Sequence, residues 1–433
     1  MSSKYSNLFF IIGILLLALL LFYPLFIPGR CLFTTDDNLG MMPSIKNIMP
    51  QGFFGYWSDS FLLGVGGRVP FPMWATVFLW LMPGRFGFNW LHAFDLILAS
   101  IALAMFLRGA GLHWMAIVLG AITAFWLGSN LTLTYAGHLG KFGALMFAAA
   151  SLYGIRKTFD SDQPWLWSVV TGGFIGFMLM EQQDLALFFG LFLGAYALFR
   201  AVLVFRHSAG FKCFLILVPM GLVALIMSGA TLMLVYTQNV SSIAAQQEDN
   251  PRQKWEFTTQ WSWPPEESID FIAPGYMGWR SGEADGPYWG RMGRSSGWEK
   301  TSQGFMNFKL ENQYLGAIPL VFALFAVFIV LLSSKFRRLD SGSCETNLAN
   351  HENIDWDNIK PEVYFWFFAA VLSLLLSFGK HFPLYELFYQ LPAVSNIRNP
   401  NKFLQVFQLA IGILAAYGAH LIFNWRNTYK DIP

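Results

Sequence analysis

The chain has 433 residues, of which 55% are hydrophobic, 18% aromatic and only 12% charged. This composition excludes a soluble globular protein and predicts an integral membrane protein. The formal net charge of +2 gives no clustered basic face, so a nucleic-acid partner is not expected.

The first apolar segment, residues 8–26, is too long for the core of a signal peptide, and no small-residue cleavage site follows it. We expect it to remain as a membrane anchor. The three cysteines, Cys31, Cys213 and Cys344, fall at different levels of the predicted topology, so neither a disulfide nor a cysteine metal site is predicted.

Apolar stretches of about 20 residues are long enough to cross roughly 30 Å of hydrocarbon. Ten such stretches predict an all-α polytopic membrane protein, and they cover residues 8–27, 88–107, 113–129, 141–155, 164–180, 185–205, 213–236, 314–333, 362–379 and 403–424. An eleventh apolar segment, residues 71–82, is short and bounded by prolines, which favours a re-entrant or interfacial helix over a span.

The distribution of positive charge sets the orientation, because short cytoplasmic connections collect Lys and Arg. With residues 71–82 not crossing, the inner connections contain Arg108, Arg156, Lys157, Arg206, Lys212, Lys335, Arg337, Arg338, Arg426 and Lys430. If that segment crossed, Arg156 and Lys157 would lie outside, so we reject that topology.

This topology predicts three parts. Residues 1–333 form a transmembrane body that includes a first outer loop, 28–87, and a long extracytoplasmic loop, 237–313. Residues 334–361 form a polar cytoplasmic linker, and residues 362–433 form a C-terminal helix pair. The unusual polar groups then share the extracytoplasmic face.

Asp36 and Asp37 follow the first predicted span directly. Two adjacent carboxylates can ligate a divalent cation such as Mg²⁺ or Mn²⁺, or one can act as a general base while the other stays ionised. The alternative is a solvated turn that caps the next helix.

Cationic side chains on the same face are candidates for binding the phosphate of a lipid-linked ligand. They are His138 and Lys141 near Gly140, and Arg398 and Lys402 on either side of Pro400. Alternatively, Lys141 reaches the interface with only its amine, and the other pair anchors the last helix.

Carboxylates close to lipid usually have a partner or a function. Glu181 and Asp184 lie three residues apart in a turn so short that both must lie at the edge of the hydrocarbon, where they orient an acceptor, support a metal, or only end two helices. Asp95 lies within its crossing, so we expect it to face the bundle interior beside a polar group.

The long outer loop contains six tryptophans. The apolar faces of indole rings bind sugar rings, and the candidates for stacking are Trp261, Trp263, Trp279 and Trp289. The alternative is an aromatic belt that lies on lipid head groups.

Several of these segments, in this order, resemble the YfhO-like bacterial membrane proteins of the type C glycosyltransferase-like superfamily. The segments are Asp36 and Asp37, residues 60–72, residues 136–141, residues 275–282 with 286–290, and residues 396–403. Together they are spread over most of the chain.

The resemblance implies a bacterial inner-membrane enzyme that transfers a sugar from a polyprenyl-phosphate carrier to an extracytoplasmic glycan, lipid or protein. It places the catalytic role on the acid pair after the first helix. Asp36 or Asp37 is then the general base in one inverting step, and His138, Lys141, Arg398 and Lys402 stabilise the leaving phosphate. A non-catalytic protein, either a lipid-linked saccharide translocator or a structural subunit, is the alternative.

Overall fold

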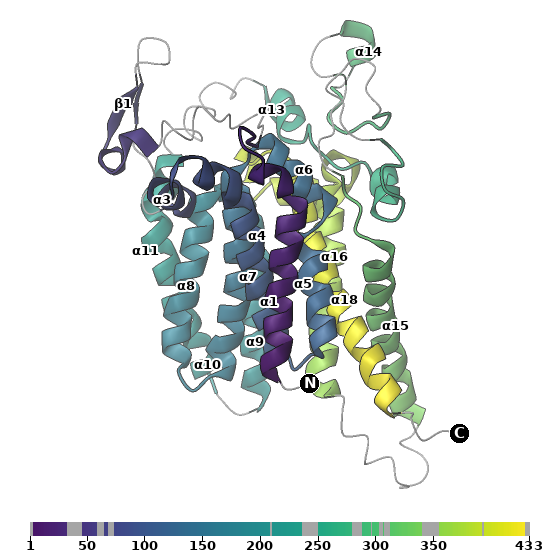
Figure 1. Cartoon of the computed structure of the whole chain (residues 1–433). Helices are drawn as coiled ribbons and strands as arrows, with labels where there is room; N and C mark the ends of the chain where they lie inside the picture. Colours follow the sequence, from purple (N-terminus) through teal and green to yellow (C-terminus); the bar gives the residue numbers. More distant parts are fainter. Residues whose placement is uncertain are drawn as a thin grey trace. The chain divides into compact units, whose positions relative to one another are not determined.

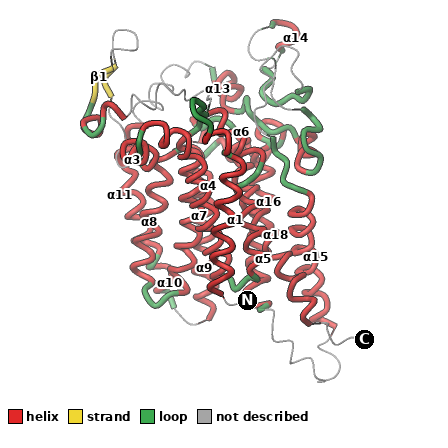
Figure 2. The backbone as a smooth tube through the Cα atoms, in the orientation of Figure 1, coloured by secondary structure: helices red, strands yellow, loops and turns green. Residues whose placement is uncertain are grey.

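The computed structural model describes most of the chain in atomic detail. The described residues are 3–32, 46–58, 65–67, 73–207, 210–235, 250–278, 288–295, 297–302, 306, 312–339, 355–391 and 394–428. Helices dominate these residues (Figure 2), and the chain divides into two compact units that are described separately.

Unit 1 comprises residues 1–102, 130–258 and 392–398. Its helices, some of which continue into unit 2, are α1 (Ser3–Leu21), α3 (Trp74–Leu81), α4 (Gly84–Gly109), α6 (Gly128–Ala136), α7 (Leu139–Asp160), α8 (Pro164–Glu181), α9 (Gln183–His207), α10 (Lys212–Leu215), α11 (Leu217–Val235) and α13 (Pro251–Thr258). Helix α8 packs on both α7 and α11, and α9 packs on α7 (Figure 1).

Glycines allow these helices to approach closely, as is common in membrane bundles. A Cβ atom on Gly172 would lie 2.5 Å from the carbonyl oxygen of Met220, and one on Gly154 would meet the Thr171 side chain. The backbones of α8 and α11 therefore touch where a larger residue would separate them.

Unit 2 comprises residues 103–129, 259–391 and 399–433. Its helices are α5 (Trp114–Phe125), α14 (Trp298–Thr301), α15 (Ala317–Leu339), α16 (Trp356–Ser377), α17 (Pro383–Tyr389) and α18 (Phe403–Thr428). Helix α18 packs against α5, α15 and α16. It is buried almost throughout residues 403–421, which is typical of a central helix.

Short 3₁₀ helices connect several elements, and they cover Tyr23–Phe26, Gln51–Phe53, Pro265–Phe271, Gly379–His381, Val394–Asn396 and Pro400–Lys402. Residues 28–87 also contain two antiparallel paired strands, β1 (Tyr56–Ser58) and β2 (Val65–Gly67), with Trp57 opposite Gly66. The sequence did not predict this pair, because each strand has only three residues.

The prediction of an α-helical membrane protein is confirmed at the level of its long apolar helices. Within the described residues, five helices are long and apolar enough to cross a membrane, or six if α5 and α6, which meet at 45°, form one span. Helix α3 has eight residues, about 12 Å. It is too short to cross roughly 30 Å of hydrocarbon, as predicted.

The two units divide the chain differently from the three predicted parts. The predicted C-terminal helix pair, α16 and α18, packs with α5 and α15. Helix α15 continues to Leu339 and α16 begins at Trp356, so both ends of the predicted linker are helical. The remainder of that linker, 340–354, lies outside the described residues.

Candidate functional site

The candidate site in unit 1 lies where α3 meets α4 and α8. The indole N–H of Trp74 donates a hydrogen bond to Oδ1 of Asp95 at 2.8 Å. The backbone N–H of the next residue, Ala75, donates to Oε1 of Glu181 at 3.2 Å. We call Trp74, His92, Asp95 and Glu181 the α3 cluster.

Glu181 caps α3 from another helix. The first N–H groups of an α-helix have no partner within the helix, and the N-cap residue of α3, Met73, makes no side-chain hydrogen bond to them. The positive end of the α3 dipole therefore faces a carboxylate. This contact offsets the unfavourable interaction of the Glu181 carboxylate with the negative, C-terminal end of its own helix, α8.

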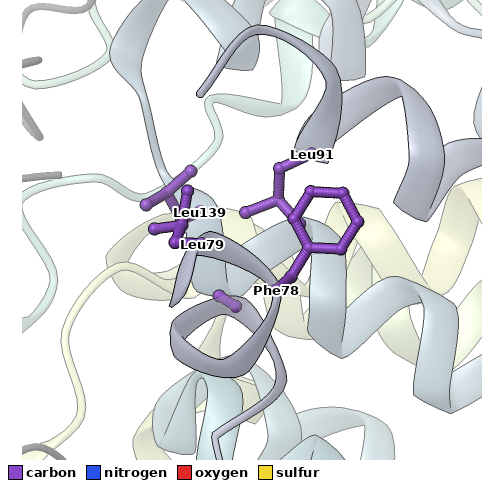
Figure 3. Close-up of a cluster of buried hydrophobic side chains, with 5 residues drawn as sticks. Phe78, Leu79, Leu91 and Leu139 are labelled. Carbon is purple, nitrogen blue, oxygen red and sulfur yellow. The ribbon is translucent and has the colours of Figure 1, made fainter. Parts of the chain in front are cut away.

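Apolar side chains fix α3 over the end of unit 1. Phe78 and Leu79 of α3 are buried against Leu91 of α4 and Leu139 of α7, together with Ala75 (Figure 3). Because α7 begins and α8 ends at this level, the cluster lies at one end of the helices. This is the end that contains Glu181, Asp184, His138 and Lys141.

Two glycines of α7 make room for Glu181. A Cβ atom on Gly143 would lie 2.7 Å from Oε2 of Glu181, and one on Gly140 would collide with the Glu181 carbonyl oxygen. A larger residue at Gly143 would displace the Glu181 carboxylate, and one at Gly140 would displace the Glu181 backbone. Residues 136–141, one of the segments on which the family resemblance rests, thus have a direct steric role in the α3 cluster through Gly140.

The α3 cluster contains buried polar atoms without partners. His92 and Asp95 are fully buried, and Glu181 is 5% exposed. Among the described residues, no hydrogen-bond partner exists for either ring nitrogen of His92, for Oδ2 of Asp95 or for Oε2 of Glu181. The His92 ring stands edge-on to Phe142 of α7, with 4.7 Å between ring centroids.

Asp36 and Asp37 lie outside the described residues. The chain on both sides of them is hydrogen-bonded to unit 1 where α3 leads into α4. The backbone N–H of Leu32 donates to Oδ1 of Asn89 at 3.1 Å, and the Lys46 ammonium donates to the Met82 carbonyl. In the part of the chain that the structure describes, no group of three or more His, Cys, Asp or Glu residues has the arrangement of a metal site.

The other predicted residues of unit 1 have different environments. His138 is the N-cap residue of α7, and Lys141, in the first turn, is 5% exposed. Asp184 lies in the first turn of α9, where its Oδ1 accepts a hydrogen bond from the Leu185 N–H at 2.6 Å. A carboxylate is stabilised there by the helix dipole, which favours a structural role for Asp184.

Arg398 and Lys402 fall in different units. The Arg398 guanidinium lies 3.8 Å from the centroid of the Phe257 ring, and burial lowers its pKa. Lys402 ends the 3₁₀ helix Pro400–Lys402, which precedes α18. Arg398 is therefore engaged with an aromatic face of α13 within unit 1.

The tryptophans of the long loop separate into interior and surface residues. Trp263 is fully buried, stacks on Phe271 at 5.7 Å and donates its indole N–H to Ser268. A buried ring has no face for a sugar, so Trp263 is not retained as a stacking residue. The Trp261 ring lies against the backbone of Gly293, and Trp279 lies outside the described residues.

Trp289 is the exposed tryptophan that fits the prediction best. It is 61% exposed and meets Tyr276, itself 52% exposed, with 5.6 Å between ring centroids and 60° between planes. The backbone N–H of Trp289 donates a hydrogen bond to the Met277 carbonyl at 3.1 Å. We call Tyr276 and Trp289 the aromatic platform.

Buried carboxylates hold the backbone of the aromatic platform. Glu267 accepts hydrogen bonds from the Tyr288 hydroxyl at 2.6 Å and from the backbone N–H groups of Arg291 and Met292. Asp270 accepts from the Met277 N–H at 3.0 Å. Gly290 is required, because a Cβ atom there would lie 2.5 Å from Glu267.

An ion pair within this loop lies beside the segment before α17, where Arg291 Nη1 is 3.3 Å from Nδ1 of His381. Both oxygens of Glu266 accept from the Arg291 guanidinium, which lowers the pKa of Glu266 and raises that of Arg291. Burial and the positive charges of Arg291 and Lys380 lower the pKa of His381 from 6.5 to about 4. His381 is therefore neutral at pH 7.

Comparisons with protein families, with curated proteins and with solved structures found no match. The site must therefore be interpreted from its own geometry.

Three residues of the α3 cluster and the aromatic platform were not identified from the sequence. Trp74 was not singled out, although an indole N–H in an apolar helix needs an acceptor. His92 lies three residues before Asp95, a spacing that places both on one helix face. The sequence did not indicate Tyr276, because its ring contacts Trp289 only once the loop has folded.

Replacement of Trp74 by Phe removes the donor to Asp95 but keeps an aromatic ring. A buried acceptor without its partner costs about 1–3 kcal/mol, so we expect Trp74→Phe to lower the melting temperature of the purified protein. Trp165→Phe is the matched control, because Trp165 is 53% exposed at the opposite end of α8. Equal melting temperatures for the two variants would contradict the assignment.

His381 should make stability depend on pH in acid. Its folded-state pKa, about 4, lies below its ordinary value of 6.5, so between these values the unfolded chain binds more protons than the folded protein. The contribution of His381 to the free energy of unfolding is therefore complete above pH 6.5 and is lost as the pH falls towards 4. We expect a shallower loss of melting temperature over this range in His381→Asn.

Glu386→Gln is the control for this titration, since it neutralises an exposed carboxylate on the neighbouring helix α17. A wild-type slope in His381→Asn would show that His381 does not contribute.

Proposed function

We propose that this protein is a membrane glycosyltransferase that moves a sugar from a polyprenyl-phosphate carrier to an extracytoplasmic glycan, lipid or protein. The observation that carries the proposal is the anchoring of the chain on both sides of Asp36 and Asp37. Leu32 is fixed to Asn89, and Lys46 to Met82, at the end of unit 1 that also contains the α3 cluster and His138.

The proposed topology has ten crossings in the bacterial inner membrane, with the active face extracytoplasmic. Each of the ten predicted crossings corresponds to a helix of the structure. Six of these, if α5 and α6 form one span, have the length and apolarity of a membrane span, and α1, α7, α8 and α15 are proposed as the other four crossings. The short helix α3 closes the outer end of unit 1, where a polyprenyl chain can remain in lipid while its phosphate reaches polar groups.

In the proposed reaction, Asp36 or Asp37 removes the proton from the acceptor hydroxyl as its oxygen attacks the anomeric carbon of the sugar. The bond from that carbon to the phosphate oxygen breaks, and polyprenyl phosphate leaves with the bonding electrons. The leaving phosphate needs charge stabilisation more than protonation. His138, Lys141 and Arg398 are the cationic groups of unit 1 proposed for this role.

A divalent cation is proposed at Asp36 and Asp37, because adjacent carboxylate oxygens suit Mg²⁺ or Mn²⁺. Such an ion would supply positive charge near the phosphate. In unit 2, the aromatic platform is proposed to bind a sugar ring of the acceptor. Support comes from the two exposed rings and from the hydrogen bonds of Glu267 and Asp270, which fix the loop that presents them.

Loss of the acid pair should abolish transfer. Purified protein in lipid vesicles is given polyprenyl phosphates that carry radiolabelled hexoses or pentoses, and label transfer to cell-envelope acceptors is measured. Removal of a general base costs roughly 10²–10⁴-fold in rate, so Asp36→Asn or Asp37→Asn should reduce transfer by that factor. Asp162→Asn, in the exposed turn between α7 and α8, is the control.

Transfer at the wild-type rate in both variants, with equal amounts of folded protein, would exclude this catalytic assignment. Movement of the labelled lipid across the vesicle membrane without transfer would instead support a translocator.

Removal of the platform tryptophan should weaken acceptor binding without slowing the chemical step. Loss of about 1 kcal/mol of stacking corresponds to roughly a fivefold rise in KM for the acceptor, with kcat unchanged. We expect this for Trp289→Ala but not for Trp165→Ala, which removes another exposed indole. Unchanged acceptor KM with weaker membrane attachment in Trp289→Ala would favour an aromatic belt.

A further inference from the structure

The α3 cluster contains two buried carboxyl groups that have no counter-ion in the part of the chain that the structure describes. Successive residues of α3, Trp74 and Ala75, bind Asp95 and Glu181, and the two carboxyl groups interact electrostatically. The ion pairs found among the described residues include neither Asp95 nor Glu181. One oxygen of each, Oδ2 of Asp95 and Oε2 of Glu181, has no hydrogen-bond partner there.

Such a pair is costly if both groups are ionised. Moving a carboxylate from water into a protein interior costs several kcal/mol even after relaxation, and an adjacent negative charge adds repulsion. The dipole of α3 and two hydrogen bonds offset part of this cost for one negative charge. They do not supply a second positive charge, so the geometry accommodates one carboxylate and one neutral carboxylic acid.

The titratable groups around the pair come from three helices. His92 lies on α4 one turn before Asp95, His138 and Lys141 lie at the start of α7, and Asp184 begins α9. Helix α3 itself contributes no titratable side chain. His92 is the informative member, because it is fully buried and neither ring nitrogen has a partner among the described residues.

We propose that Asp95 and Glu181 form a proton-binding site in which the pair holds a single proton at neutral pH. One carboxylate takes a proton from a hydronium ion of the solvent, which leaves as water, and becomes a carboxylic acid, on Oδ2 of Asp95 or Oε2 of Glu181. His92 is the neighbouring group able to accept or return that proton. The site is independent of glycosyl transfer, and its ligand is the proton, not a metal ion.

Infrared spectroscopy of the full-length protein in lipid nanodiscs at pH 7 tests this site. The carbonyl stretch of a protonated carboxylic acid should be present in the wild type. It should lose the intensity of one carboxyl group in the double variant Asp95→Asn with Glu181→Gln. Glu266→Gln, which removes an exposed carboxylate paired with Arg291, should retain the wild-type spectrum.

A wild type without this band at pH 7, or a double variant with wild-type intensity, would overturn the proposal, and the first result needs no variant. The single variants give a second readout. An amide at one position matches the charge of a pair that holds one proton, so the melting temperature of Asp95→Asn or Glu181→Gln should stay within about 4 °C of wild type. A rise of more than this in both single variants would mean that both groups are ionised in the wild type, because an amide at either position removes the repulsion between them.

Discussion

The docking of α3 depends on one constraint: polar groups removed from water must find partners inside the protein. This helix has only eight residues, and its own N-cap residue leaves the first N–H groups without a side-chain acceptor. Glu181 supplies the acceptor from α8, and Trp74 in turn satisfies one oxygen of Asp95 on α4. Three segments of the chain are therefore fixed by a single set of polar contacts.

Close packing makes these contacts possible. Gly140 and Gly143 leave the volume that Glu181 occupies, and Gly172 brings α8 against α11. In unit 2, Gly418 of α18 lies directly on the carbonyl of Phe322 in α15. Because water cannot drive apolar helices together inside a bilayer, small residues that permit backbone contact provide much of the association energy.

The two units present different chemistry. Unit 1 buries carboxyl groups and an imidazole beneath α3, which suits proton binding and the handling of charge close to lipid. Unit 2 uses buried carboxylates, Glu267 and Asp270, to hold a loop whose exposed side chains are aromatic. In the proposed function, unit 1 would handle the lipid-linked donor and unit 2 would bind the hydrophilic acceptor.

The sequence by itself determined the class of long apolar helices, the positions of most of them and the shortness of the helix within residues 71–82, because apolar length is a local property. It also indicated that Asp95 must face a polar group, since an intramembrane carboxylate is costly to bury. Only the tertiary structure decided that its partner is Trp74, that Glu181 caps α3, and that Trp263 is interior while Trp289 is exposed. Such partners lie 21 to 106 residues apart, and their meeting depends on helix packing that no local pattern encodes.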